Sequence, residues 1–235
     1  MSRRGGALAR LRRLIWRALR LALLVLLAWI GAYAWVAPPT TALIETERAR
    51  LGAVAWTWRP LSEISPHLAR AVVAAEDSRF CAHWGFDFDE LRKALEGGAR
   101  RGASTITQQT AKNAFLFPGR SWLRKALEAG FTPLIELIWG KRRILEVYLN
   151  IAEMGPGVFG AEAAARRWFG KPAAALTAAE SARLAAILPS PRERDPTRPS
   201  AFQRRRAAAI RDGAATIRAQ DRDACFLRGA AEGGR

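Results

Sequence analysis

The sequence predicts a mainly helical protein, with one membrane-spanning helix followed by one helical domain. An apolar run without charged side chains covers residues 21–37, and with the apolar residues before it this is long enough for a helix to cross a bilayer. Helix start signals recur along the rest of the chain, and no segment alternates apolar and polar residues as a half-buried strand does. At 235 residues the chain has room for one domain and short accessory segments.

The N-terminal part predicts a basic cytoplasmic segment over residues 1–13 and a transmembrane anchor over residues 14–37. Seven Arg and no acidic residue fall within residues 1–20. Because basic residues stay on the cytoplasmic side of a membrane helix, the N-terminus is expected in the cytoplasm. The rest of the chain is then expected on the other side of the inner membrane.

A cleaved signal peptide is the alternative interpretation of the apolar run. Ala32-Tyr33-Ala34 offers an A-x-A cleavage site. The run is long for a signal peptide, and Trp29, Tyr33 and Trp35 near its far end suit the headgroup region. These features favour an uncleaved anchor.

After the anchor, residues 38–60 are interpreted as a connector, residues 61–191 as the folded domain and residues 192–235 as a basic extension. Helices are expected where a capping residue precedes helically spaced apolar residues. The helix that follows Ser121 is expected to bend or break at Pro133. The predicted helix starts are Ser65 with Pro66, Asp87 with Leu91 on the buried face, Thr105, Ser121, Thr177 and about Ser200.

The net charge of +17 implies an anionic partner, either nucleic acid or a phospholipid surface. The apolar anchor favours the membrane, and no nucleic-acid partner is expected. The two cysteines, Cys81 and Cys225, lack the spacing of a zinc site. An oxidising compartment would allow them to pair, but the sequence does not bring their Cα atoms together, and two unbonded cysteines are the favoured interpretation.

The chemistry-bearing residues lie between residues 75 and 128, where two glutamates flank polar and cationic side chains. One carboxylate can handle a proton while Lys and Arg stabilise an anionic leaving group, which suits the transfer of a sugar. The glutamates are Glu76 and Glu128. The polar residues are Ser104, Thr105, Thr107, Gln108 and Gln109, and the cations are Lys112, Arg120, Arg124 and Lys125.

Each of these residues also has an ordinary structural interpretation. Glu76 could be an exposed acid that pairs with Arg79, and Glu128 could be a surface partner of Arg124 four residues earlier. Half of the hydroxyl and amide groups could be helix caps or core hydrogen-bond partners. His83 and Asn150 are interpreted as structural, and the role of Glu153 is left open.

The order of these blocks resembles the family 51 glycosyltransferases, which polymerise the glycan strands of bacterial peptidoglycan from lipid II. The resemblance runs from about Ile64 to Pro191, and the short chain with one apolar anchor is similar to the monofunctional members of Gram-negative bacteria. It implies a lysozyme-like helical lobe and a smaller membrane-proximal lobe. The blocks are Glu76-Asp77-x-x-Phe80-x-x-His83-x-Gly85, Ser104-Thr105-x-Thr107-Gln108-Gln109 with Lys112, and Arg124-Lys125-x-x-Glu128. Where the family usually has Gly before that Ser-Thr pair, this chain has Ala103.

The resemblance implies that Glu76 is the general base and takes the proton of the acceptor 4-hydroxyl as it attacks C1 of the donor. Glu128 is expected to organise the leaving pyrophosphate, directly or through a divalent cation such as Mg²⁺ or Mn²⁺. A role as proton donor is the less favoured alternative, because a pyrophosphate leaves as a stable anion. Lys112 and Arg120 match positions that contact the donor phosphates. The apolar and basic segment from Phe115 to Leu123 is expected to help open the site toward the bilayer.

The expected activity is polymerisation of donor and acceptor lipid II into β-1,4-linked glycan, with inversion at C1 and release of undecaprenyl pyrophosphate. Other cell-wall synthesis or division proteins are further expected partners. The chain has neither a Ser-x-x-Lys motif nor Lys-Thr-Gly, which excludes a penicillin-binding transpeptidase. The alternatives are a membrane-anchored lysozyme-like hydrolase or lytic transglycosylase, and a basic membrane-tethered binding protein.

Overall fold

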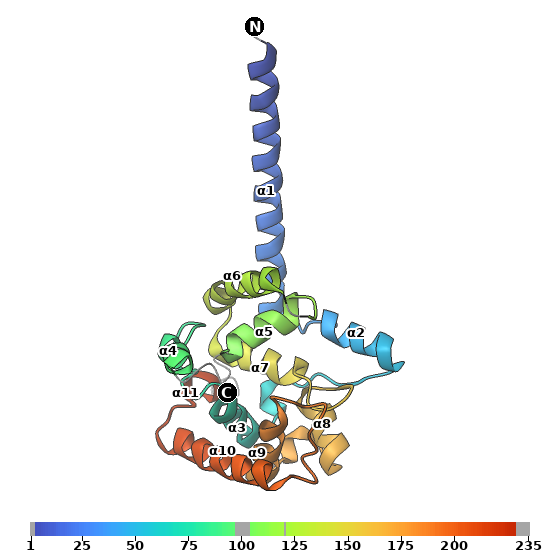
Figure 1. Cartoon of the computed structure of the whole chain (residues 1–235), viewed down its shortest axis with the longest axis vertical. Coiled ribbons are helices and arrows are strands. Elements are labelled where there is room, and N and C mark those ends of the chain that lie inside the picture. The colour runs from blue at the N-terminus through green and yellow to red at the C-terminus, as the bar shows by residue number, and fades with distance from the viewer. Residues whose placement is uncertain (1–2, 97–103, 120, 229–235) are drawn as a thin grey trace, which may run out of the picture. The chain divides into compact units, whose positions relative to one another are not determined.

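The computed structural model describes residues 3–96, 104–119 and 121–228. It divides into two compact units, residues 1–37 and residues 38–235. The first unit is a single helix, α1 (Arg3–Trp35) (Figure 1). Its segment Ala9–Trp35 is long and apolar enough to cross a membrane, with a mean hydropathy of 1.9. The predicted apolar helix is therefore present.

The second unit is helical apart from two short strands. Its helices in chain order are α2 (Ala42–Leu51), α3 (Pro66–Glu76), α4 (Phe88–Glu96), α5 (Ile106–Phe115), α6 (Trp122–Ile138), α7 (Lys141–Ile151), α8 (Gly160–Phe169), α9 (Ala178–Ile187), α10 (Ala201–Ala219) and α11 (Ala224–Leu227). Two 3-10 turns cover Leu61–Glu63 and Ala173–Ala175. The strands β1 (Ala55–Trp56) and β2 (Val158–Phe159) pair in parallel.

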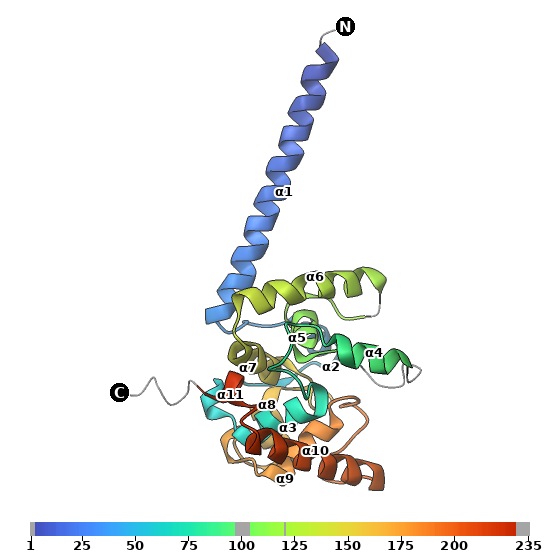
Figure 2. The same cartoon turned by 90° about the vertical axis from the view of Figure 1, so that its left-hand side faces the viewer.

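Helix α5 packs between α6 and α7, while α3, α9 and α10 pack against one another as a separate group. Within this unit, α6 lies at one end and α9 and α10 lie at the opposite end (Figures 1 and 2). The core includes the apolar faces of α3 and α7, where Leu68, Val72, Ile144 and Leu149 are fully buried.

Local capping signals explain where the helices begin. The Ser65 hydroxyl accepts a hydrogen bond from the His67 amide, and Pro66 occupies the first turn of α3. Reciprocal capping boxes start α5 at Thr105, α9 at Thr177 and α10 at Ser200, and Ser121 caps α6. The predicted helix starts at these positions are confirmed.

The helix was expected to bend or break at Pro133, and it does not break there, because α6 continues from Trp122 to Ile138. Proline removes the hydrogen bond to the carbonyl four residues earlier, here that of Ala129. Ala129 is exposed, so water can satisfy that carbonyl. On α4, Asp87 caps the Glu90 amide as expected, but Leu91 is 44% exposed rather than buried.

Residues 38–60 and 192–235 belong to the same compact unit as the domain between them. The segment expected as a connector forms α2, which is capped by Thr41, and strand β1. Arg192 joins the two segments, because its guanidinium lies 2.9 Å from the buried carboxylate of Glu47.

Cys81 and Cys225 form a disulfide with their Cα atoms 5.8 Å apart, so the interpretation as unbonded cysteines is wrong. The pairing depends on tertiary contacts that join α11 to the loop after α3. The rings of Phe80 and Phe226 lie 6.1 Å apart. The Arg70 guanidinium donates to Asp223 at 2.6 Å just before α11.

Candidate functional site

Glu76 is the last residue of α3, where the chain turns away through Asp77. Its side chain is 14% exposed, and the Gln109 amide donates a hydrogen bond to Oε2 at 3.0 Å. Nη2 of Arg206 on α10 lies 3.8 Å from Oε1. Burial raises the pKa of Glu76, while the Gln109 hydrogen bond and the charges of Arg206 and Lys112 oppose that rise. A sheltered carboxylate of this kind suits a general base.

The Gln109 side chain is held in place from its other end. The Tyr148 hydroxyl on α7 donates to Gln109 Oε1 at 3.2 Å, which leaves the Gln109 NH₂ group facing Glu76. Burial raises the pKa of Tyr148 well above its usual value, so the phenol stays protonated and remains a donor. Three residues from three helices thus form one hydrogen-bonded chain that ends at the carboxylate.

Asp77 connects the loop after α3 to the start of α5. Its Oδ2 accepts a hydrogen bond from the Ile106 amide at 3.0 Å, and its Oδ1 is hydrogen-bonded to His83 Nε2 at 2.8 Å. Both side chains are almost fully buried. The interpretation of His83 as a scaffold residue is therefore supported, and Asp77 fixes the loop next to Glu76.

Gly85 ends this loop in a conformation that other residues rarely adopt, with φ at +85°. A Cβ atom added there would lie 2.6 Å from Thr132 Cγ2 on α6. The Thr105 hydroxyl donates to the Gly85 carbonyl at 2.6 Å. The final glycine of the first sequence block thus allows the loop to pack closely between α5 and α6.

Most of the polar residues expected to contact the substrate serve the fold instead. Thr105 and Gln108 form the capping box of α5. The Thr107 hydroxyl is fully buried and donates to Glu136 at 2.6 Å. Only Gln109 reaches Glu76, and Ser104 is half-buried at the start of the segment. Helix capping and core hydrogen bonding therefore account for three of the five residues.

Glu128 on α6 is a buried ion-pair partner, with its side chain only 4% exposed. Arg124 Nη1 donates to its Oε2 at 2.9 Å, and Lys125 donates to its Oε1. The predicted pair of Arg124 and Glu128 exists, but it lies inside the protein rather than on its surface. Arg124 Nε is buried without a hydrogen-bond partner among the described residues. An unmatched buried donor next to other cations is typical of an anion site.

Lys112 on α5 links the two glutamates. Burial lowers the pKa of the half-buried Lys112, the charges of Arg124 and Lys125 lower it further, and those of Glu128 and Glu76 oppose the change. The charges of both glutamates therefore act on the Lys112 ammonium group. Arg120 and Ala103 lie outside the described residues.

Among the residues that the structure describes, the carboxylates near Lys112 are not grouped as a metal site. Arg124 and Lys125 already occupy both oxygens of Glu128, so a divalent cation would compete with two positive charges. Asp77, His83 and Asp87 also place ligand atoms within 4.8 Å of one another. Asp77 and His83 bond to each other there, and Asp87 pairs with Arg79, which indicates a capping network.

Arg206 is a site residue without a signature in the sequence. It belongs to a run of three arginines on α10, which by itself predicts only a basic helix. The expected partner of Glu76, Arg79, pairs with Asp87 and Asp89 instead. Only the packing of α10 against α3 brings Arg206 to Glu76.

Asn150 is structural, as predicted. Its side chain exchanges hydrogen bonds with the backbone N–H and C=O of Arg59, both at 2.8 Å. Glu153, whose role the sequence left open, accepts from Arg192 at 3.0 Å. Both residues join α7 and the turn after it to segments that are distant in sequence.

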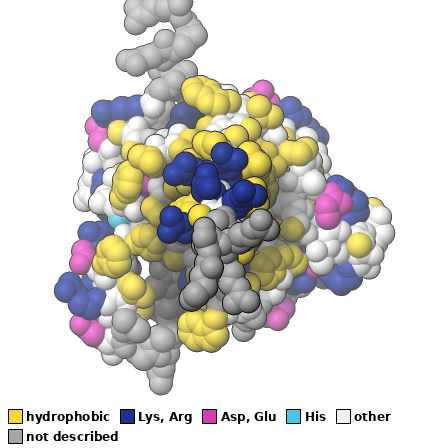
Figure 3. Space-filling view, turned by 90° about the horizontal axis from the view of Figure 1, so that it is seen from above, with side chains coloured by type: hydrophobic (Ala, Val, Ile, Leu, Met, Phe, Trp, Pro, Cys, Tyr) yellow, Lys and Arg dark blue, Asp and Glu magenta, His cyan; other side chains and the backbone are white. Residues whose placement is uncertain are grey.

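Large apolar side chains lie exposed at the start of α6 and along it. Trp122 is 91% exposed, and Phe117, Leu123, Leu127 and Leu137 are also exposed. The molecular face drawn in Figure 3 carries more hydrophobic and basic side chains than acidic ones. Exposed apolar side chains of this size usually mark an interaction surface or a membrane contact.

Comparison with known proteins gives the same family as the sequence blocks. The transglycosylase family model matches residues 45–220. A biosynthetic peptidoglycan transglycosylase of Jannaschia sp. (strain CCS1) is 58% identical over 86% of this chain and 84% of its own. Proteins with the same name from Rhodospirillum centenum and Caulobacter vibrioides are 56% and 49% identical, over 87% and 88% of this chain and 90% and 94% of theirs. The chain therefore belongs to the transglycosylase family.

Proposed function

We propose that this protein is a membrane-anchored peptidoglycan glycosyltransferase, which polymerises lipid II into β-1,4-linked glycan strands. Membership of the family supports this activity, and so do the relatives' shared name and the apolar helix α1. The single observation that carries the assignment of the site is the position of Lys112. The charges of both glutamates and of Arg124 and Lys125 all act on its ammonium group, which supports one shared site.

In the proposed reaction, the 4-hydroxyl of the acceptor sugar attacks C1 of the donor while Glu76 takes its proton. The bond between C1 and the phosphate oxygen breaks, and its electron pair leaves with undecaprenyl pyrophosphate. Because the donor is α-linked, one direct displacement gives the β bond. The pKa of Glu76 is raised and so lies closer to neutral pH than that of an ordinary Glu. A general base is most effective when its pKa lies near the pH at which the enzyme works.

Lys112 and Arg124 are proposed to stabilise the charge that develops on the pyrophosphate. Arg124 is largely shielded from solvent and Lys112 is half-buried, and Arg124 Nε has no hydrogen-bond partner among the described residues. Preorganised cations in such a site stabilise the leaving group without rearrangement. Glu128 is proposed to position Arg124 and Lys125, since both of its oxygens already accept hydrogen bonds from them.

We further propose that the N-terminus is cytoplasmic and that the catalytic unit lies in the periplasm at the inner membrane. The basic residues before the apolar run support this orientation. The disulfide supports it independently, because such bonds persist mainly in oxidising compartments. The exposed apolar side chains of α6 and Phe117 are proposed to contact the bilayer that holds the lipid substrate.

Polymerisation of labelled lipid II tests the proposal. Glu76→Gln and Glu128→Gln are each expected to remove nearly all polymer per folded molecule. The thermal unfolding temperature of Glu76→Gln is expected to stay close to that of the wild type, whereas Glu128→Gln also removes the buried counter-charge of Arg124 and is expected to lower it. Glu63→Gln, at an exposed carboxylate that pairs with Arg59, is the matched control and is expected to remain active. Retained polymerisation by Glu76→Gln would overturn the assignment of the base. Release of fragments from purified sacculi, without polymer from lipid II, would favour the lysozyme-like hydrolase instead.

A further inference from the structure

Three arginines form a stripe along α10, at the end of the unit opposite α6 (Figures 1 and 2). They are Arg204, Arg211 and Arg218, each seven residues from the next. Because seven residues make about two helical turns, the three side chains leave the helix on the same side. We refer to them as the arginine stripe.

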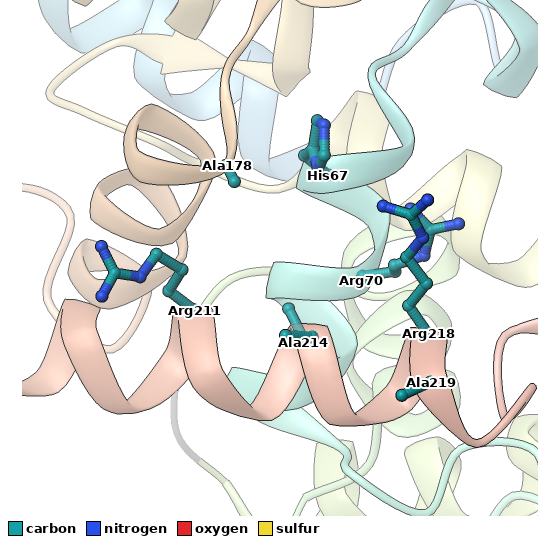
Figure 4. Close-up of a pocket in the computed structure, with 8 residues that line it drawn as sticks. His67, Arg70, Ala178, Arg211, Ala214, Arg218 and Ala219 are labelled. Atoms are coloured by element: carbon teal, nitrogen blue, oxygen red, sulfur yellow. The ribbon is translucent and has the colours of Figure 1, made fainter.

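The arginine stripe borders two neighbouring cavities that share Arg211. The larger, of about 460 Å³, lies between α3, α9 and α10 and is lined by His67, Arg70, Ala178, Arg211, Ala214, Ala215, Arg218 and Ala219 (Figure 4). The smaller, of about 180 Å³, lies between α9 and α10 and includes Arg183, Arg204, Ala207 and Ala208. Most of the residues that line the two cavities are alanines and arginines.

We refer to the two cavities together as the groove. Acidic side chains of the protein balance only part of its positive charge. Arg70 pairs with Asp223 at 2.6 Å, and Asp212, at 3.7 Å, is the only acidic partner of Arg211 among the described residues. Arg204 donates to the Pro199 carbonyl, which carries no net charge. Within the part of the chain that the structure describes, neither Arg204 nor Arg218 forms an ion pair with an acidic side chain. The groove therefore presents apolar volume and excess positive charge together.

We propose that this groove is a docking site for an acidic amphipathic helix of a partner protein. A helix lying along α10 with glutamates at a seven-residue spacing would meet the arginine stripe, and leucines between them would fill the volume above the alanines. Carboxylates that pair with arginine gain directional hydrogen bonds as well as charge attraction. The residues that line the groove are not those that pair with Glu76 or Glu128, so this inference does not depend on the proposed reaction.

A synthetic helix provides the probe. A fluorescent peptide of roughly three heptads, with Glu at one position of each heptad and Leu three or four residues later, is titrated with the full-length protein in detergent. Fluorescence anisotropy is expected to show saturable binding. Arg211→Glu and Arg218→Glu are each expected to weaken it about tenfold, as for loss of an interfacial ion pair. Arg205→Glu is the matched control, because Arg205 is exposed on the same helix but lines neither cavity.

A charge exchange makes the test specific. A peptide with Lys in place of Glu is expected to bind the Arg211→Glu/Arg218→Glu double variant more tightly than the wild type. Ala215→Trp, which fills the larger cavity, is expected to weaken the acidic peptide without changing net charge. Equal affinity for wild type and charge-reversed variants would overturn the proposal. So would equal binding of a sequence-scrambled acidic peptide or a sulfated polysaccharide, because a general anionic surface contact would then suffice. Unchanged lipid II polymerisation by each variant verifies that it is folded.

Discussion

Removal of the disulfide between Cys81 and Cys225 should destabilise the catalytic unit substantially. The bond joins residues that are 144 positions apart. The chain-entropy relation for a loop of that length gives a stabilisation of about 5 kcal/mol, and measured disulfides usually contribute about 2–4 kcal/mol. For a unit of about 200 residues, each 1 kcal/mol shifts the unfolding temperature by about 2–4 °C. We therefore expect Cys225→Ser to lower it by roughly 5–15 °C.

Thermal unfolding followed by circular dichroism in detergent measures this effect. Reductant should lower the unfolding temperature of the wild type to that of Cys225→Ser and leave the variant unchanged. Cys81→Ser should match Cys225→Ser, and the double variant should show no additional loss, because all three lack the same bond. If thiol titration shows full reduction of the wild type while its unfolding temperature stays constant, the inference that the disulfide stabilises the catalytic unit is wrong.

Further predictions concern the base, the core and the membrane contact. Burial raises the pKa of Glu76, so the rise of kcat/KM with pH should occur above the usual pKa range of Glu. Arg206→Gln removes a charge that lowers this pKa, so the rise should move to still higher pH. An unchanged pH profile would exclude the electrostatic role of Arg206. Thr107→Val should lower stability by about 1–3 kcal/mol through the hydrogen bond lost from buried Glu136, with activity per folded molecule retained; denaturant unfolding and a polymerisation assay measure the two effects. Trp122→Ser should reduce binding of the catalytic unit to vesicles and turnover of lipid II in vesicles, while activity in detergent stays at the wild-type level. If the variant and the wild type have equal rates in vesicles as well as in detergent, Trp122 has no role at the membrane.

The elements with local signals were the ones that the sequence predicted well. A capping residue with Gln or Glu three positions later specifies a helix start within four residues, so Thr105, Thr177 and Ser200 could be recognised directly. Helix α2 was missed because its apolar spacing is weak, although Ile44 is fully buried. Its burial depends on packing against α5, which is a contact the local sequence does not encode.

The sequence predicted the residue types of the candidate site but not the contacts between them. The glutamates and cations stand in recognisable blocks, yet the same hydroxyl and amide groups can cap a helix or bind a sugar. The structure uses Thr105, Thr107 and Gln108 for the fold. The contacts of Glu76 with Gln109 and Arg206 come from separate helices, and sequence spacing contains no information about them.

Residues on α10 and α11 complete the surroundings of Glu76 and the disulfide, and this has a consequence for biogenesis. Arg206 and Cys225 follow Glu76 and Glu128 in the sequence, so they leave the ribosome after them and, in the proposed orientation, cross the membrane after them. A nascent chain exported only through α9 already contains Glu76 and Glu128 but lacks both Arg206 and the disulfide. We therefore expect the pKa of Glu76 and the stability of the catalytic unit to reach their final values only after α10 and α11 have crossed the membrane.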